Sequence, residues 1–382
     1  MATPFNLPIS KTPKPEIPKW APPQPTKMHL DWADLRTIEL SLLDSPDPEV
    51  VAGLVAKTKA AIEEDGFLFL TNYGVSLEQL HRQFDLAQFL HANISEEDKA
   101  KLLWDPSTGV FAGFKPRFGW KREPGKFDGI EHFNFYSPEF EDIKKVPECI
   151  VPFMDEITAF CDYLMNSVNR RLLKLLSLVL ELPDDYLWEN VQSHDGLVGD
   201  GYFRHALYYP LEAKHKKERK GIRMYGHTDY GTTTLLFSVP VTALQIWGSD
   251  NKWRYVKYKP GALVVNLGET LEVAEPPADQ ENEQRLSLVF FNGSKGDMRL
   301  KPAMESPLIQ REGFVLKQGV FTQFKKLIDS GRPVPTNKEW REAQVRTRLQ
   351  MAPEERLAGA KDINGTKYGA DVILGVQVVL PA

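Results

Sequence analysis

Gly226-His227-Thr228-Asp229 is the most informative stretch of this sequence, and a strand-like run, 232–237, follows it closely. Residues two apart in a strand point to the same side, so His227 and Asp229 aim an imidazole and a carboxylate at one place. A mononuclear Fe(II) site of the facial type uses two histidines and one carboxylate, and leaves its other positions open. The pair therefore predicts two of the three protein ligands of such a site.

The third ligand is missing from the place where the pattern requires it. His227 is the last histidine of this 382-residue chain, so no histidine follows the dyad. Every other histidine lies upstream, and each is interpreted as a surface or core residue rather than a ligand. These are His29, His81, His91, His132, His194, His205 and His215.

Composition limits the classes of protein to consider. Hydrophobic residues make up 42% and charged residues 26%, which is ordinary for a globular protein. A net charge of −5 argues against a nucleic-acid partner, which would favour a basic face. Two cysteines, Cys149 and Cys161, form no disulfide framework and suit a reducing compartment. No apolar segment reaches the roughly 20 residues that span a bilayer. We expect a cytoplasmic protein, a monomer by default, without a membrane partner.

The N-terminal half predicts a proline-stiffened arm followed by an α/β module. Residues 1–29 are rich in proline and are interpreted as an extended strap on the surface. Asp47-Pro48 predicts a helix start, residues 67–70 predict a buried strand, and Ser76 and Ser95 each predict a further helix start.

The second half begins with a long helix and continues with short strands. An apolar stripe at helical spacing predicts a helix near 152–182 that packs on a sheet. Turn residues then separate strand-like runs, which is typical of a sandwich or jelly roll. Helical patterns return after Gly319. The predicted strands are 202–209, 232–237, 244–247, 253–258, 262–266 and 286–291.

A later strand carries a second chemical signal, Arg285-Leu286-Ser287. The two-residue period places the guanidinium and the hydroxyl on one face, which suits a grip on a carboxylate. A structural salt bridge to an acidic neighbour is the alternative interpretation of Arg285.

Taken together, these segments resemble the iron(II)/2-oxoglutarate dioxygenases of the isopenicillin N synthase-like family. The form Arg204-His-Ala-Leu-Tyr-Tyr-Pro is most similar to fungal members. The segments that carry the resemblance are Glu64-Asp-Gly-Phe-Leu-Phe-Leu-Thr-Asn-Tyr-Gly-Val, Gly226-His-Thr-Asp-Tyr-Gly-Thr-Thr-Thr-Leu-Leu, Pro260-Gly-Ala-Leu-Val-Val-Asn-Leu-Gly-Glu-Thr-Leu-Glu and Arg285-Leu-Ser.

The resemblance implies an α+β fold dominated by a double-stranded β-helix. It implies an arm (1–29), an N-terminal module (30–150), an oxygenase domain (151–330) and a C-terminal helical extension and tail (331–382). It also implies that Fe(II) sits on His227 and Asp229, with no catalytic residue beyond the metal site. The far carboxylate of 2-oxoglutarate would lie on Arg285 and Ser287, with a hydroxyl from Tyr208 or Tyr209. Hydroxylation, desaturation or cyclisation of a small organic molecule with O₂ would follow, with succinate and CO₂ as co-products.

The chain departs from the family between Glu272 and Pro276, where the family has a turn and a strand that carries the distal histidine. Three explanations stay open: a shortened version of an active enzyme, a pseudoenzyme, or a substitute oxygen ligand from Glu272, Glu275 or Asp279. Loss of a strand predicts unpaired backbone groups and a core gap near Val265 and Leu288. Weak iron binding is the expected consequence.

The substrate is less defined by the sequence. Aromatic residues near the expected site, Phe133, Phe135 and Tyr202, are candidates for the pocket lining and suggest a hydrophobic or flat molecule. A protein of another class remains an alternative, namely one that binds a small anion through Arg285 without oxidising anything.

Overall fold

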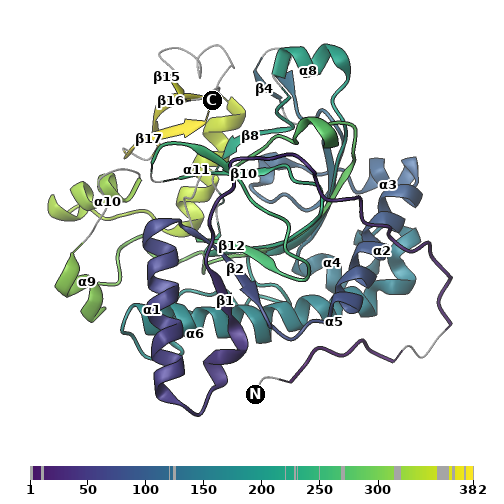
Figure 1. The fold of residues 1–382 in the computed structure, drawn as a ribbon. Helices are drawn as coiled ribbons and strands as arrows, with labels where there is room; N and C mark the ends of the chain where they lie inside the picture. Colours follow the sequence, from purple (N-terminus) through teal and green to yellow (C-terminus); the bar gives the residue numbers. More distant parts are fainter. Residues whose placement is uncertain are drawn as a thin grey trace.

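Two β-sheets lie at the centre of the molecule, and helices surround them (Figure 1). The computed structural model describes residues 3–9, 13–119, 121–123, 126–219, 221–227, 229, 231–248, 250–267, 272–313, 320–350, 361–363, 366–373 and 376–381. No helix within these ranges is both long and apolar enough to cross a membrane.

The larger sheet has eight strands in the order β1-β2-β12-β9-β14-β7-β6-β3. Its neighbouring strands run antiparallel except for the pair β1 and β2. The strands are β1 (Thr37–Glu39), β2 (Phe67–Thr71), β12 (Leu263–Leu267), β9 (Thr233–Phe237), β14 (Arg285–Asn292), β7 (Tyr202–Tyr208), β6 (Ile130–Phe135) and β3 (Gly113–Lys115).

The smaller sheet has four antiparallel strands in the order β11-β10-β13-β8. From β7 onward the chain passes back and forth between the two sheets, which makes a double-stranded β-helix, as predicted. The strands are β8 (Met224–His227), β10 (Leu244–Trp247), β11 (Trp253–Tyr255) and β13 (Glu272–Ala274).

The long helical segment predicted at 152–182 runs along the larger sheet. It consists of η4 (Glu148–Phe153), α5 (Met154–Tyr163), one π-helical stretch, η5 (Leu164–Asn169), and α6 (Arg170–Val179). The ring of Phe160 lies 5.8 Å from that of Phe203 in β7 and 5.7 Å from that of Phe237 in β9. The apolar stripe therefore packs on the sheet, as its period indicated, and Cys161 is fully buried in the same core.

The N-terminal helices begin where their capping residues predict. Asp47 accepts a hydrogen bond from the Glu49 amide at the start of α1 (Pro48–Glu64). Ser76 and Gln79 form a capping box at the start of α2 (Leu77–Asn93), and Ser95 caps α3 (Glu96–Lys101). These caps satisfy amide groups that helix geometry leaves unpaired.

The core gap predicted near Val265 and Leu288 does not form. Val265 is 1% exposed and Leu288 is fully buried. Strand β13 lies between β10 and β8, with Leu244 opposite Ala274 and His227 opposite Glu272. The shortened connection therefore still supplies a strand to the smaller sheet. The predicted core gap near Val265 and Leu288 was wrong.

The N-terminal arm is a strap held at several points along its length. Phe5 is buried and packs against Phe160. Trp20 stacks on Phe84 of α2, with ring centroids 4.3 Å apart. Thr26 donates a hydrogen bond to Asp279 (2.7 Å), which follows β13 in the sequence. The arm thus joins the helical layer to the loop that follows β13 (Figure 1).

The C-terminal segment contains helices, as predicted, and an unpredicted sheet. Helices α10 (Val320–Asp329) and α11 (Asn337–Gln350) meet through Phe324 and Trp340, whose ring centroids are 5.1 Å apart. The predicted tail includes the antiparallel strands β15 (Lys361–Ile363), β16 (Thr366–Ile373) and β17 (Val376–Pro381). The remaining elements are η1 (Leu40–Asp44), η2 (Pro106–Thr108), β4 (Lys121–Glu123), β5 (Lys126–Phe127), α4 (Ser137–Glu141), η3 (Ile143–Lys145), α7 (Tyr186–Asn190), α8 (Ala213–Arg219), η6 (Ala278–Gln280) and α9 (Pro307–Glu312).

Candidate functional site

The predicted dyad lies at the end of β8. His227 is the last residue of that strand, and its Nε2 atom is 3.8 Å from Oδ1 of Asp229. The other carboxylate oxygen of Asp229 accepts hydrogen bonds from Thr234 Oγ1 (2.7 Å) and Asn266 Nδ2 (3.1 Å). Strands β9 and β12 of the larger sheet therefore orient the carboxylate, and its remaining oxygen stays available beside the imidazole.

The donor atoms of the dyad suit a single metal ion. Bonds from a metal ion to histidine or carboxylate ligands are about 2.0–2.2 Å long. Two such bonds together are longer than the 3.8 Å between His227 Nε2 and Asp229 Oδ1, so one ion can contact both atoms. An imidazole nitrogen with a carboxylate oxygen is also the mixed donor set of Fe(II) oxygenase sites. The residues present fit two of the three protein contacts that the facial site uses.

A third ligand does not join them within the described part of the chain, where no cluster of three His, Cys, Asp or Glu side chains could hold a metal. Glu275 was predicted as a substitute, but its carboxylate accepts a hydrogen bond from Gln245 Nε2 at 3.3 Å. Burial raises the pKa of Glu275. Because β13 runs antiparallel to β8, Glu275 lies about 10 Å along the strand from the position opposite His227. The prediction for Glu275 is therefore wrong.

Glu272, the other predicted substitute, has a different position. Its backbone pairs with that of His227 across the two strands. Residues that face each other in an antiparallel pair have neighbouring Cβ atoms. The side chain of Glu272 lies outside the described residues, so the register alone places this residue at the dyad.

Arg285 and Ser287 lie together on β14, as their spacing predicts. Arg285 is 5% exposed and Ser287 is fully buried. Arg285 Nε and Ser287 Oγ are buried and have no hydrogen-bond partner among the described residues. A buried guanidinium without an anion is costly, so this pair of groups suits a ligand carboxylate that neither finds in the protein.

A second buried arginine adds positive charge at this place. Arg223, which precedes β8, is 1% exposed and donates to the carbonyl oxygens of Glu281 and Glu283, both at 2.7 Å. Burial, and then the nearby charge of Arg285, lower the pKa of Arg223 to about 10. The sequence offered no signal for Arg223, because a single arginine before a strand is usually a surface residue.

The two tyrosines predicted to contact 2-oxoglutarate, Tyr208 and Tyr209, line different cavities. The Tyr208 ring lies 5.0 Å from the Arg285 guanidinium, and Tyr208 lines the same cavity as His227. Tyr209 points away from it and lines a second cavity, with the Arg117 guanidinium 4.2 Å from its ring. Burial and a hydrogen bond to Glu131 raise the pKa of Tyr209. Only Tyr208 is placed to contact a ligand held by Arg285.

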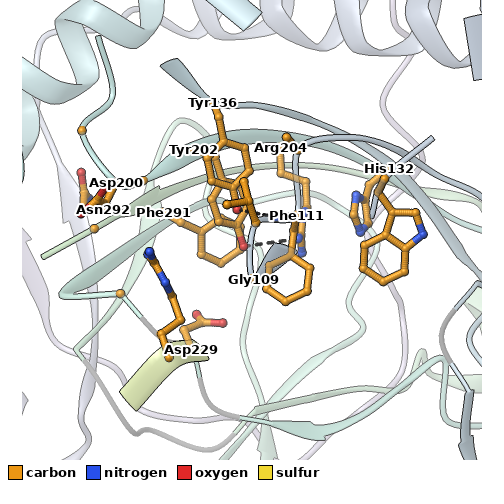
Figure 2. A pocket seen from close by; sticks show the side chains of 18 of the residues that line it. Gly109, Phe111, His132, Tyr136, Asp200, Tyr202, Arg204, Asp229, Phe291 and Asn292 are labelled. Atoms are coloured by element: carbon orange, nitrogen blue, oxygen red, sulfur yellow. Dashed lines mark hydrogen bonds between the residues drawn. The ribbon is translucent and has the colours of Figure 1, made fainter. Parts of the chain in front are cut away.

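A cavity of about 720 Å³ opens over the dyad, within the range of small-molecule sites. His227, Asp229 and Tyr208 line it, and so does the predicted Tyr202. Figure 2 shows the rings of Tyr136, Tyr202 and Phe291 beside Arg204, with Asp229 below them in this view. The cavity therefore extends from His227 and Asp229 to a wall of aromatic side chains.

Phe133 and Phe135 were predicted in this wall, but they lie in the core. Both are fully buried, and their ring centroids are 4.8 Å apart. Ile130 and His132, which alternate with them along β6, line the cavity instead. The sequence did not show which side chains of β6 point into the cavity, because every residue of this strand is buried.

The C-terminal helix α11 also contributes to the cavity, through Asn337 and Arg341. Asn337 Nδ2 donates to the Ser294 carbonyl oxygen at 3.1 Å, which fixes the start of the helix beside the end of β14. The charged pattern of 337–349 gave no indication of this role.

Comparison with known proteins agrees with the geometry. Residues 35–150 match the family model described as the N-terminal part of the non-haem dioxygenases in morphine synthesis, and residues 203–294 match that of the 2OG-Fe(II) oxygenase superfamily. Gibberellin 20 oxidase 3 of Arabidopsis thaliana is 25% identical, with 71% of this chain and 74% of the relative aligned. The 2-oxoglutarate-dependent dioxygenase FG08081 of Gibberella zeae is 24% identical over 76% of this chain and 88% of its own.

A solved structure shows the same fold. A full-length protein of Neurospora crassa, solved in complex with alpha-KG, superimposes with a TM-score of 0.66. The match covers 82% of this chain and 96% of the Neurospora protein, at 16% identity. The agreement spans the N-terminal module and the β-helix together.

Proposed function

Because the chain belongs to the 2OG-Fe(II) oxygenase superfamily, of the isopenicillin N synthase-like type, we propose that His227 and Asp229 hold its Fe(II). Arg285, Ser287 and Tyr208 hold 2-oxoglutarate. The enzyme is a dioxygenase that uses Fe(II), 2-oxoglutarate and O₂ on a small organic molecule. When bound, the metal and its co-substrate supply the oxidising chemistry, with succinate and CO₂ as co-products.

One observation carries the assignment of the co-substrate site: Arg285 Nε and Ser287 Oγ are buried without a hydrogen-bond partner among the described residues. The Arg285 guanidinium also lies 5.0 Å from the ring of Tyr208, which lines the cavity of the dyad. A carboxylate placed there gains charge-assisted hydrogen bonds that the protein itself does not provide. Thr234 and Asn266 keep Asp229 oriented, so the carboxylate does not reorganise when a ligand enters.

The missing histidine limits the expected activity of this chain. With two identified protein ligands, iron binding is weak and uncoupled conversion of 2-oxoglutarate to succinate is slow. The three explanations of the departure lead to different outcomes. A shortened enzyme recovers when a histidine is restored, a substitute ligand makes the existing site sensitive to its removal, and a pseudoenzyme responds to neither.

The register of β13 gives a direct test. Glu272→His places a histidine at the position opposite His227, whereas Glu275→His places one further along the strand. Anaerobic Fe(II) titration and succinate release are measured for both variants and the unaltered chain. We expect tighter iron and faster succinate release for Glu272→His alone. Stoichiometric tight iron and robust turnover in the unaltered chain would refute the proposed limitation.

A binding protein without oxidation remains the second candidate, because two buried arginines and an incomplete metal dyad suit an anion by themselves. Calorimetric titration with 2-oxoglutarate separates the two candidates. Binding that requires Fe(II) supports the oxygenase, and equal binding without metal supports the anion-binding protein.

The remaining assignments follow from charge and cysteine content. The net charge of −5 disfavours a nucleic-acid partner, and Cys149 and Cys161 are both free thiols. We place the protein in the cytoplasm as a monomer. Light scattering of the purified chain tests the oligomeric state.

A further inference from the structure

Arg204 occupies the middle of β7, and its guanidinium lines the cavity. Its Nε donates to Asn134 Oδ1 at 2.8 Å, and one terminal nitrogen donates to the Tyr202 hydroxyl at 3.3 Å. Asn134 is fully buried, and its amide nitrogen donates to the Phe111 carbonyl at 2.5 Å. Neutral groups therefore fix the orientation of Arg204, and no carboxylate among the described residues pairs with it.

The guanidinium stands against a stack of three rings. Tyr202 lies between Tyr136 and Phe291, with ring centroids 4.6 Å and 4.5 Å away. The Arg204 Cζ atom is 5.2 Å from the Tyr202 ring and 5.0 Å from the Phe291 ring. Burial raises the pKa of Tyr136 well above its usual value, so its phenol stays neutral. The stack gives a flat, uncharged wall with the Arg204 guanidinium at its edge (Figure 2), and Arg341 of α11 is a further cation in the cavity lining.

This cation is separate from the anchor of the co-substrate. Tyr208, which faces Arg285, is four residues further along β7, a distance of about 13 Å in a strand. Both residues lie on the cavity side of β7 because the strand period is two. One anion at Arg204 and another at Arg285 can thus be bound at the same time.

We propose that the substrate is a flat, apolar molecule with a single carboxylate, which Arg204 binds while the body packs on Tyr136, Tyr202 and Phe291. This proposal rests on the proposed function only in naming the bound molecule a substrate. A planar guanidinium with free donors forms a two-point contact with a carboxylate. The cavity is also lined by Glu141, Asp195 and Asp200, which disfavour further negative charge on the body of the ligand.

The experiment compares an acid with its neutral counterpart. 1-Naphthaleneacetic acid and 1-naphthaleneacetamide share a flat apolar body and differ in charge. Calorimetry on the full chain, without metal or 2-oxoglutarate, measures both. We expect the acid to bind at least about tenfold more tightly, as hydrogen bonds to charged groups are among the stronger ones. Arg204→Gln removes that preference and leaves the amide unchanged, and Arg204→Lys keeps part of it.

Arg170→Gln is the matched control, because that arginine also lies over a ring, 5.3 Å from Trp188, but is half exposed outside the cavity. Arg170→Gln should change neither the affinity for the acid nor that for the amide. Thermal unfolding verifies that each variant is folded, and 2-oxoglutarate affinity should be the same with and without Arg204→Gln. Equal binding of acid and amide, a preference that survives Arg204→Gln, or no binding of either probe overturns the proposal. Failure to bind 2-oxoglutarate would instead count against the proposed function, since the acid–amide comparison does not depend on it.

Discussion

Replacing Arg285 by methionine is expected to weaken 2-oxoglutarate binding without a large loss of protein stability. The guanidinium is 5% exposed, lies near the charged Arg223, and has a buried nitrogen without a partner among the described residues. Removing it relieves a desolvation cost and forfeits a cation–π contact with Tyr208 of about 0.5–2 kcal/mol. The free energy of unfolding of the metal-free protein should therefore stay within about 1 kcal/mol or rise.

The affinity for 2-oxoglutarate should fall sharply in the same variant. Loss of one partner of a buried, hydrogen-bonded charge pair costs about 2–5 kcal/mol, so the Kd should rise by about 30-fold or more. Anaerobic calorimetry with Fe(II) gives the affinity, and urea denaturation gives the stability.

Arg82→Met is the matched comparison, because Arg82 makes two hydrogen bonds to Glu156, at 2.7 and 2.9 Å. Its loss should lower stability and leave 2-oxoglutarate binding unchanged. Destabilisation by Arg285→Met as large as that by Arg82→Met, or a Kd for 2-oxoglutarate within about threefold of the original, would contradict the placement of Arg285.

Three further outcomes are expected. Tyr208→Phe should weaken 2-oxoglutarate binding by about 3- to 10-fold, the size of one hydrogen bond, while Tyr209→Phe should not; equal effects in calorimetry would contradict the placement. Glu272→Ala should weaken Fe(II) binding if that residue is a ligand, and Glu275→Ala should not, as measured by anaerobic titration; a larger effect of Glu275→Ala would reverse the assignment. Burial alone would raise the pKa of Glu156, but hydrogen bonds from Arg82 and Lys14 leave it lowered. The ionised Glu156 carboxylate therefore contributes to the free energy of unfolding above its unfolded pKa near 4.5, and this contribution is lost as pH falls below that value. Glu156→Gln should lower the free energy of unfolding by about 1–3 kcal/mol at pH 7 and make it depend less on pH below about 4.5. An unchanged pH dependence, measured by urea denaturation, would argue against this ion pair.

Features set by neighbouring residues could be predicted well. The caps Asp47, Ser76 and Ser95 act within one turn of their helices, and the helix on the sheet follows from an apolar stripe. Arg285 and Ser287 share a face because the two-residue period of strand β14 determines it. Asp229 lies just past the end of β8, and its carboxylate is still 3.8 Å from the His227 imidazole.

Features that depend on distant partners could not be predicted. Strand β13 has three residues with no strong strand pattern, and it forms because β8 and β10 both offer pairing groups. The side chain of Phe133 points into the core and that of His132 into the cavity, although both residues lie on a strand that is buried throughout. The split between Tyr208 and Tyr209 follows from which neighbours, Arg285 or Glu131, lie on each side of the sheet.

The contribution of α11 to the cavity has a consequence for divergence within the family. Asn337 and Arg341 line the cavity, yet they lie beyond residues 203–294, which include His227 and Asp229 and match the oxygenase superfamily. Changes in this C-terminal segment can therefore alter the substrate preference, while the residues that we propose to hold iron and 2-oxoglutarate stay the same.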